Sequence, residues 1–290
     1  MISWKKPEGV LAEYRWIPSG SKRLKLLIAR RKEPAEKRVP GVLWIHGGGY
    51  LTGMPEMVYM SRAIDLVLRC GAVVVSPAYT LSWKKPYPAA LMECHDALVY
   101  MKEQAGELGI REDQIMVGGE SAGGGLAAAV CLYTRDHGGP EIALQLPLYP
   151  MLDCEDTASS RDNHGRVWNT KRNHWGWRRY LGDLYGTEKV PAYASPARET
   201  DYRNLPPCYT FVSDGEPFYR ETLDYVRHLQ EAGGKAAVDV YPGNVHAFDM
   251  LCPWRRTSRA AKKKLCRVYE AWILKGTLQN GKEPEQTGGG

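Results

Sequence analysis

From about residue 41 onward, short apolar runs alternate with longer segments of helical periodicity. The apolar runs, which we expect to be strands, lie at residues 42–45, 72–75, 114–117, 142–148, 209–212 and 237–241. The expected helices cover residues 57–70, 88–108, 122–134 and 221–232. Strands that are apolar throughout, with helices between them, indicate a sheet that is covered on both faces. The pattern therefore predicts an α/β fold in which helices flank a mostly parallel central sheet.

Two regions depart from this alternation. Residues 11–16 and 24–29 alternate weakly between apolar and polar positions, which predicts a leading antiparallel pair of strands. Residues 153–191 contain no strand-like run, but aromatic residues gather there: Trp168, Trp175, Trp177, Tyr180 and Tyr185. Such a segment is not typical of a bare loop, so we expect a small helical cap over the end of the sheet. Most of these rings should pack the cap onto the body, and one or two should face a pocket.

The chain length of 290 residues suits one large domain with a small subdomain. We assign residues 1–152 and 192–280 to the core, residues 153–191 to the helical cap and residues 281–290 to a disordered tail. The sequence leaves open whether the N-terminal segment adds to the cap.

Composition and charge exclude several classes of protein. A hydrophobic share of 43% with 25% charged residues is ordinary for a globular chain. The net charge of +6 comes from dispersed basic runs, whereas a nucleic-acid footprint would be concentrated on one element. Seven cysteines without a C-x-x-C pair indicate reduced thiols in the cytoplasm. The N-terminus lacks the apolar stretch of a signal peptide, and no run approaches the ~18 residues of a membrane span. We therefore expect a cytoplasmic protein without a nucleic-acid partner or a membrane span.

The segment Gly119-Glu120-Ser121-Ala122-Gly123 follows a predicted strand and begins a predicted helix. On so sharp a turn the serine backbone is strained, and small flanking residues are needed because larger ones would collide with neighbouring strands. The turn directs Oγ of Ser121 out of the sheet edge and places the N–H of Ala122 at a helix N-terminus. This context indicates a nucleophilic serine.

The segment His46-Gly47-Gly48-Gly49-Tyr50 directly follows the strand predicted at residues 42–45. Glycines allow the main chain to approach a substrate, and backbone N–H groups aimed at a developing oxyanion stabilise the transition state of acyl transfer. Such a glycine run commonly supplies the second oxyanion donor of esterases. His46, at the root of this loop, is expected to make a structural hydrogen bond rather than to act as the base. A turn rich in Pro, Gly and Asn after the last strand should instead bring His246 over Ser121.

Together these motifs resemble the hormone-sensitive-lipase-like esterases (family IV, α/β-hydrolase fold-3) of the α/β-hydrolase superfamily. The likeness runs from about residue 41 to residue 247. It includes Leu-Tyr-Pro-Met-Leu-Asp at 148–153, Ala-Ser-Pro-Ala-Arg at 194–198, Leu-Pro-Pro at 205–207 and the Gly-x-x-His-x-Phe segment around His246. The resemblance implies an α/β-hydrolase fold with a helical cap and a serine carboxylesterase that hydrolyses small esters with short acyl chains.

The same resemblance implies the remaining site residues. Alignment on Pro217-Phe218 places Glu216 where the family usually has the triad aspartate, and Asp214 remains the alternative acid. Glutamate can fill this role because the acid only orients the imidazole and stabilises its cation. Glu120, where the family more often has aspartate, is expected to project away from the histidine.

The sequence thus predicts a catalytic triad of Ser121, His246 and Glu216, with the N–H groups of Gly48, Gly49 and Ala122 as the oxyanion hole. Neither a metal nor an organic cofactor is implied, and the expected partner is a small-molecule ester. Three alternatives stay open: an amidase or peptidase, a deformylase or acyl transferase, and a non-catalytic ligand-binding homologue. The sequence also leaves open whether the chain forms a homodimer.

Overall fold

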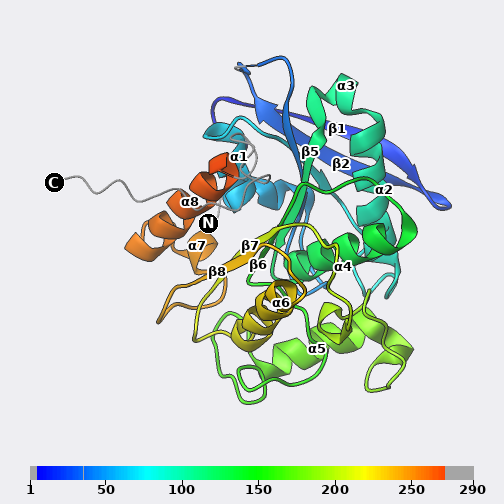
Figure 1. Ribbon diagram of the computed structural model, residues 1–290, viewed down its shortest axis with the longest axis vertical. Coiled ribbons are helices and arrows are strands. Elements are labelled where there is room, and N and C mark those ends of the chain that lie inside the picture. Colours follow the sequence, from blue (N-terminus) through cyan, green and yellow to red (C-terminus); the bar gives the residue numbers. More distant parts are fainter. Residues whose placement is uncertain (1–4, 35, 272–290) are drawn as a thin grey trace.

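The computed structural model describes residues 5–34 and 36–271, and the tail expected at residues 281–290 lies outside them (Figure 1). Within the described residues, eight strands form one sheet in the order β1-β2-β4-β3-β5-β6-β7-β8. Their bounds are β1 Val10–Ser19, β2 Lys22–Arg31, β3 Val39–Ile45, β4 Val73–Pro77, β5 Ile110–Glu120, β6 Leu144–Leu148, β7 Cys208–Val212 and β8 Ala236–Val240. β2 pairs antiparallel with both β1 and β4, and every other pairing is parallel. The predicted sheet, including its leading antiparallel pair, is confirmed.

Helices cover both faces of this sheet (Figure 1). Their bounds are α1 Arg62–Leu68, α2 Ala89–Glu103, α3 Ala105–Leu108, α4 Ala122–His137, α5 Thr170–Leu181, α6 Tyr219–Glu231, α7 Phe248–Leu251 and α8 Arg256–Tyr269. Short 3-10 turns add η1 Pro55–Met60, η2 Gly182–Leu184 and η3 Pro196–Arg198. Helices α2, α4 and α6 pack on one face, and α1, α7 and α8 pack on the other.

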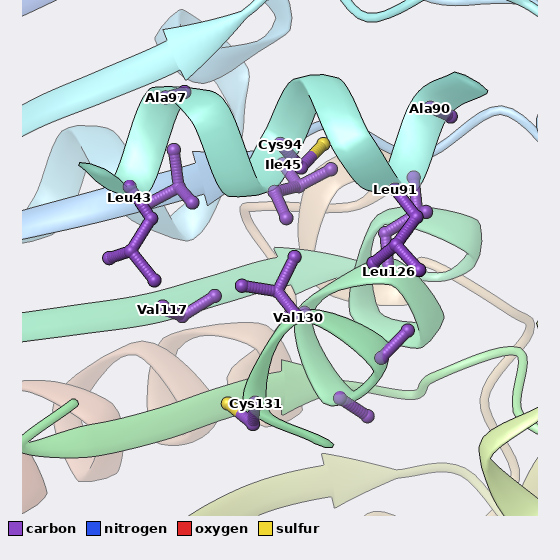
Figure 2. Packing of buried hydrophobic residues seen from close by; sticks show 14 of the residues in the cluster. Leu43, Ile45, Ala90, Leu91, Cys94, Ala97, Val117, Leu126, Val130 and Cys131 are labelled. Atoms are coloured by element: carbon purple, nitrogen blue, oxygen red, sulfur yellow. The ribbon is translucent and has the colours of Figure 1, made fainter. Parts of the chain in front are cut away.

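The alternation of side chains along β3 explains why both faces need a cover. Leu43 and Ile45 belong to the core cluster under α2 and α4, whereas Val42 and Trp44 belong to the cluster under α1 and α8. Figure 2 shows the first cluster, in which Leu43 and Ile45 lie among side chains of α2 and α4 such as Leu91. Because both faces are buried, the strand is apolar at every position from 42 to 45.

The predicted helices at 57–70 and 88–108 require correction, because each is divided. Ser61 separates η1 from α1, since its Oγ accepts a hydrogen bond from the N–H of Ala63 at 3.0 Å and so begins a new helix. Gln104 separates α2 from α3, and Gly109 ends α3 with φ at +70°. Helices α5, α7 and α8 were not among the individually predicted helices.

The segment between β6 and η3 contains helix α5, which begins after Asn169, whose side chain accepts a hydrogen bond from the N–H of Arg172. Trp177 and Tyr180 are buried, and the Tyr180 ring stacks on Tyr50 with centroids 3.9 Å apart. Trp175, by contrast, is 55% exposed. Some of these rings therefore pack in the interior, and others lie on the surface. The division of the chain into a core and a cap at residues 153–191 stays a prediction. Among the described residues, no helix combines the length and apolarity that crossing a bilayer requires.

Candidate active site

The predicted site residues lie on segments that follow strands β3, β5, β7 and β8. These four strands run parallel, so their carboxyl ends meet at one edge of the sheet. Ser121 stands at the turn from β5 into α4 with φ at +57° and ψ at −121°, outside the ordinary regions for a residue with a side chain. Its N–H donates to the carbonyl of Leu148 and its own carbonyl accepts from Met151, both at 3.0 Å. These bonds to the neighbouring segment hold the strained turn in place.

The small residues around Ser121 are sterically required, as the sequence predicts. A methyl group on Gly119 would lie 2.4 Å from the carbonyl oxygen of Ile45, and one on Gly123 would lie 2.1 Å from the same atom. Real Cβ atoms do not approach backbone oxygens so closely, so any larger residue would push the turn away from β3.

His246 lies in the loop after β8, and its Nε2 is 2.9 Å from Oγ of Ser121. The edges of two aromatic rings confine the imidazole: its centroid is 5.1 Å from that of Tyr149 and 5.0 Å from that of Phe218. The loop is tied to the end of β7, because Oγ of Ser213 donates to the carbonyl of Asn244 at 2.7 Å. The imidazole is therefore held in one orientation before any substrate arrives.

Glu216 completes the row of side chains. Its Oε2 accepts a hydrogen bond from Nδ1 of His246, and its Oε1 accepts one from the N–H of Ser213 at 2.9 Å. Burial raises the pKa of the Glu216 carboxyl, while the charge and hydrogen bond of His246 oppose that rise. The alternative acid, Asp214, is exposed and its Oδ1 accepts instead from the N–H of Gly243 at 2.8 Å. The structure thus brings Glu216, and not Asp214, against the imidazole.

The glycine loop after β3 lies beside the serine. A methyl group on Gly47 would lie 3.3 Å from Cβ of Ser121. Gly48 and Gly49 have φ values of +115° and +61°, which glycine adopts without the strain that a side chain would bring. Ala122 is the first residue of α4, where the free N–H groups and the helix dipole favour negative charge. The three expected oxyanion donors therefore belong to the two segments that meet at Ser121.

His46 is buried, and its Nδ1 donates to the carbonyl of Gly47 at 2.8 Å. Its ring stacks on Tyr79 at a centroid distance of 4.2 Å, and the Tyr79 hydroxyl donates to the carbonyl of His46. Burial lowers the pKa of His46 to about 4, so the ring is neutral at pH 7. These contacts give His46 the structural hydrogen bond that the sequence predicts.

A buried network of charges beside the site was not predicted. Asp249 lies 3.0 Å from Nε of Arg62 and accepts a hydrogen bond from the hydroxyl of Tyr149 at 2.9 Å. Arg62 also pairs with Asp65 at 2.8 Å. Tyr149 thus contacts both Asp249 and the imidazole of His246. The sequence signal was slight: an arginine and an aspartate three residues apart in a largely apolar helical stretch, and a carboxylate three residues after His246.

Glu120 is directed toward Trp44 and away from His246, as expected. It is buried, and its Oε2 accepts a hydrogen bond from Nε1 of Trp44 at 2.8 Å. Burial, together with the nearby charge of Asp249, raises the pKa of Glu120 to about 8. Its carboxyl is therefore mostly protonated at pH 7 and is unsuited to stabilising an imidazolium.

The structure also bears on metal binding and on the cysteines. Within residues 5–34 and 36–271, no group of three or more His, Cys, Asp or Glu side chains is placed to hold a metal ion. All seven cysteines lie within the described residues and none of them forms a disulfide there, while their reduced state stays a prediction.

Comparison with known proteins places the chain in a family. Residues 42–250 match the model of a family described as having the alpha/beta hydrolase fold. The chain belongs to this family. The expected resemblance to the hormone-sensitive-lipase-like esterases is thereby confirmed.

Individual relatives point to the same chemistry. The chain is 30% identical over 217 residues to the esterase LipI of Mycobacterium tuberculosis, covering 74% of this chain and 67% of that protein. It is 31% identical over 215 residues to an arylesterase of Saccharolobus solfataricus, covering 71% of this chain and 67% of that protein. A solved bacterial heroin esterase superposes with a TM-score of 0.87 at 29% identity, covering 94% of this chain and 86% of that one. The chain is an ester-hydrolysing α/β hydrolase, and it spans about two thirds of the length of these curated relatives.

Proposed function

We propose that this chain is a serine carboxylesterase that hydrolyses small esters with short acyl chains through an acyl-serine intermediate. The observation that carries the proposal is the continuous row from Ser121 through His246 to Glu216, with Oγ 2.9 Å from Nε2. A nucleophile within hydrogen-bond reach of a base, with the base oriented by a third group, is the arrangement that activates a serine.

In the first half-reaction, Oγ of Ser121 attacks the ester carbonyl while Nε2 of His246 takes the hydroxyl proton. The carbonyl oxygen becomes an oxyanion, which the N–H groups of Gly48, Gly49 and Ala122 are proposed to stabilise. The imidazolium then gives its proton to the leaving alcohol as the C–O bond breaks, and the acyl group stays on Oγ.

In the second half-reaction, water attacks the acyl-serine carbonyl and gives a proton to His246. The tetrahedral intermediate collapses, Oγ takes the proton back and the carboxylic acid leaves. Glu216 keeps the Nδ1–H of the imidazole fixed throughout, so that Nε2 can alternate between base and acid. The small-ester preference follows from the family resemblance, and we propose that the segment 153–191 acts as the cap that encloses this substrate.

The proposal is tested by comparing the parent protein with Ser121→Ala on p-nitrophenyl acetate. The parent should turn over the ester, and the variant should lose at least about 10³-fold in kcat because it lacks the nucleophile. A panel of ester, anilide and formamide substrates then separates an esterase from an amidase or a deformylase. Turnover by Ser121→Ala at the parent rate would refute the serine mechanism.

A further inference from the structure

One aromatic ring from the segment between β6 and α5 lies directly on the glycine loop after β3, called the oxyanion loop below because it holds the proposed donors Gly48 and Gly49. A methyl group placed on Gly49 would lie 2.1 Å from Cη2 of Trp168 and 2.9 Å from Cζ2. The six-membered part of the indole therefore occupies the space that a side chain at residue 49 would take. Trp168 is half-buried, unlike the exposed Trp175 on the helix that follows.

The indole is held in this position by its own segment. Its Nε1 donates to Oδ1 of Asn173, a fully buried residue of α5, at 3.2 Å. The same helix passes close to the loop at Gly176, where a methyl group would lie 3.2 Å from the carbonyl of Gly49 and 3.4 Å from Cε of Met151. Glycine at this helical position lets α5 bring the tryptophan down onto the loop.

The segment that carries Trp168 is also fixed to the loop of the triad acid. Oγ of Ser159 donates to the carbonyl of Pro217 at 2.6 Å, and Nδ2 of Asn163 donates to the carbonyl of Gly215 at 3.3 Å. The Trp168 ring in turn lies 6.4 Å, centroid to centroid, from Phe218. Trp168 therefore spans from the acid side of the site to the oxyanion loop.

The position of Trp168 indicates whether its ring restricts the size of the acyl group or of the alcohol group of an ester. In an acyl-serine reaction the leaving oxygen has to lie at Nε2 of His246, and the Phe218 ring packs against this imidazole with centroids 5.0 Å apart. The Trp168 ring also approaches Phe218, but its Cη2 and Cζ2 atoms lie against Gly49, on the oxyanion side of the serine. We propose that Trp168 is the wall of the acyl subsite and sets the maximum length of the acyl chain. This inference rests on the proposed serine esterase function.

The test compares Trp168→Ala and Trp168→Phe with the parent on p-nitrophenyl acetate, butyrate and octanoate. The ratio of kcat/KM for octanoate to that for acetate should rise at least about tenfold in Trp168→Ala, since each methylene that gains an apolar contact contributes about fourfold. Trp168→Phe should give a smaller rise in the same direction. Trp175→Ala, an exposed tryptophan on α5, is the matched control and should leave the ratio unchanged.

The outcomes separate this inference from the proposed function. A parent protein without esterase activity, or one whose serine is dispensable, would refute the proposed function itself. An active parent whose variants lose activity equally on all three esters would overturn the inference, because a purely structural ring does not change a ratio. A change confined to a series of acetates with larger alcohols would also overturn it. Should Trp168→Ala fail to fold, as judged by circular dichroism, the ratio measured on Trp168→Phe decides.

Discussion

Replacement of Glu216 by glutamine tests the proposed role of Glu216 as the acid of the triad. The glutamate holds Nδ1–H of His246 with Oε2 and the N–H of Ser213 with Oε1. A glutamine that keeps the bond to Ser213 must turn its NH₂ group toward Nδ1. The imidazole then carries its proton on Nε2, and Nε2 can no longer accept the proton of Ser121.

The size of the expected loss in kcat follows from the burial of Glu216 and His246. Both Glu216 and His246 are almost inaccessible to solvent, so water cannot replace the lost charge or the lost acceptor. Inverting the tautomer and removing the carboxylate of a triad lowers kcat about 10³- to 10⁴-fold, which corresponds to about 4–5.5 kcal/mol of transition-state stabilisation. The effect should fall on kcat with little change in KM, since the acid does not contact the substrate in the proposed mechanism.

The assay is steady-state hydrolysis of p-nitrophenyl acetate by parent, Glu216→Gln and the control Asp214→Asn, with thermal melts to show that each is folded. Asp214→Asn should stay within about twofold of the parent, because this carboxylate is exposed and its Oδ1 accepts from the N–H of Gly243 at 2.8 Å rather than from His246. A folded Glu216→Gln that keeps more than a tenth of the parent kcat, or an equal loss in Asp214→Asn, would contradict the assignment.

Two further predictions concern the buried groups beside the site. The folded pKa of Glu120 is about 8 against an ordinary value of 4.5, so between these pH values the folded state binds a proton that the unfolded chain has released, and stability falls as pH rises. The unfolding free energy of Glu120→Gln, measured by urea titration, should therefore rise relative to that of the parent between pH 5 and pH 8, by up to about 1.4 kcal/mol per pH unit. The same difference between variant and parent at pH 5 and at pH 8 would be inconsistent with this. Tyr149→Phe removes the hydroxyl bonded to Asp249 and should cost about 1–3 kcal/mol of unfolding free energy. The ring of the variant still packs on His246. The loss of kcat/KM at 25 °C, expressed as a free energy, should therefore be smaller than the loss of unfolding free energy. A larger loss in kcat/KM would show that the hydroxyl acts in catalysis rather than in stability.

The sheet was predictable because each parallel strand is buried on both faces and so is apolar throughout, as Val42, Leu43 and Trp44 illustrate. Helix ends were harder to predict, because they depend on single caps. Ser61 begins α1 through one side-chain hydrogen bond in a stretch whose apolar periodicity continues across it. Helix α8 was missed because its exposed face carries many lysines and arginines, while only a few residues such as Ala261 and Leu265 reach the core.

Some residues of the site could likewise be predicted from their neighbours in the sequence, whereas others are brought together only by the fold. Ser121 and the glycine loop are recognisable because strain and close approach require particular small residues next to each other in the sequence. Glu216 and Asp214 are two residues apart in one loop, and the fold of this loop decides which carboxylate reaches His246. No local sequence pattern specifies that fold. The pairing of Arg62 with Asp249 joins residues 187 positions apart, so only the folded chain brings it into view.

In the proposed mechanism, Oγ of Ser121 is the atom that carries the acyl group. The most direct measurement is reaction of the parent protein with a fluorophosphonate, followed by mass spectrometry of the intact chain and of its peptides. We expect one phosphonyl group per chain, located on Ser121, with loss of esterase activity in proportion to labelling. Complete labelling at another residue, or full activity after Ser121 is modified, would contradict it.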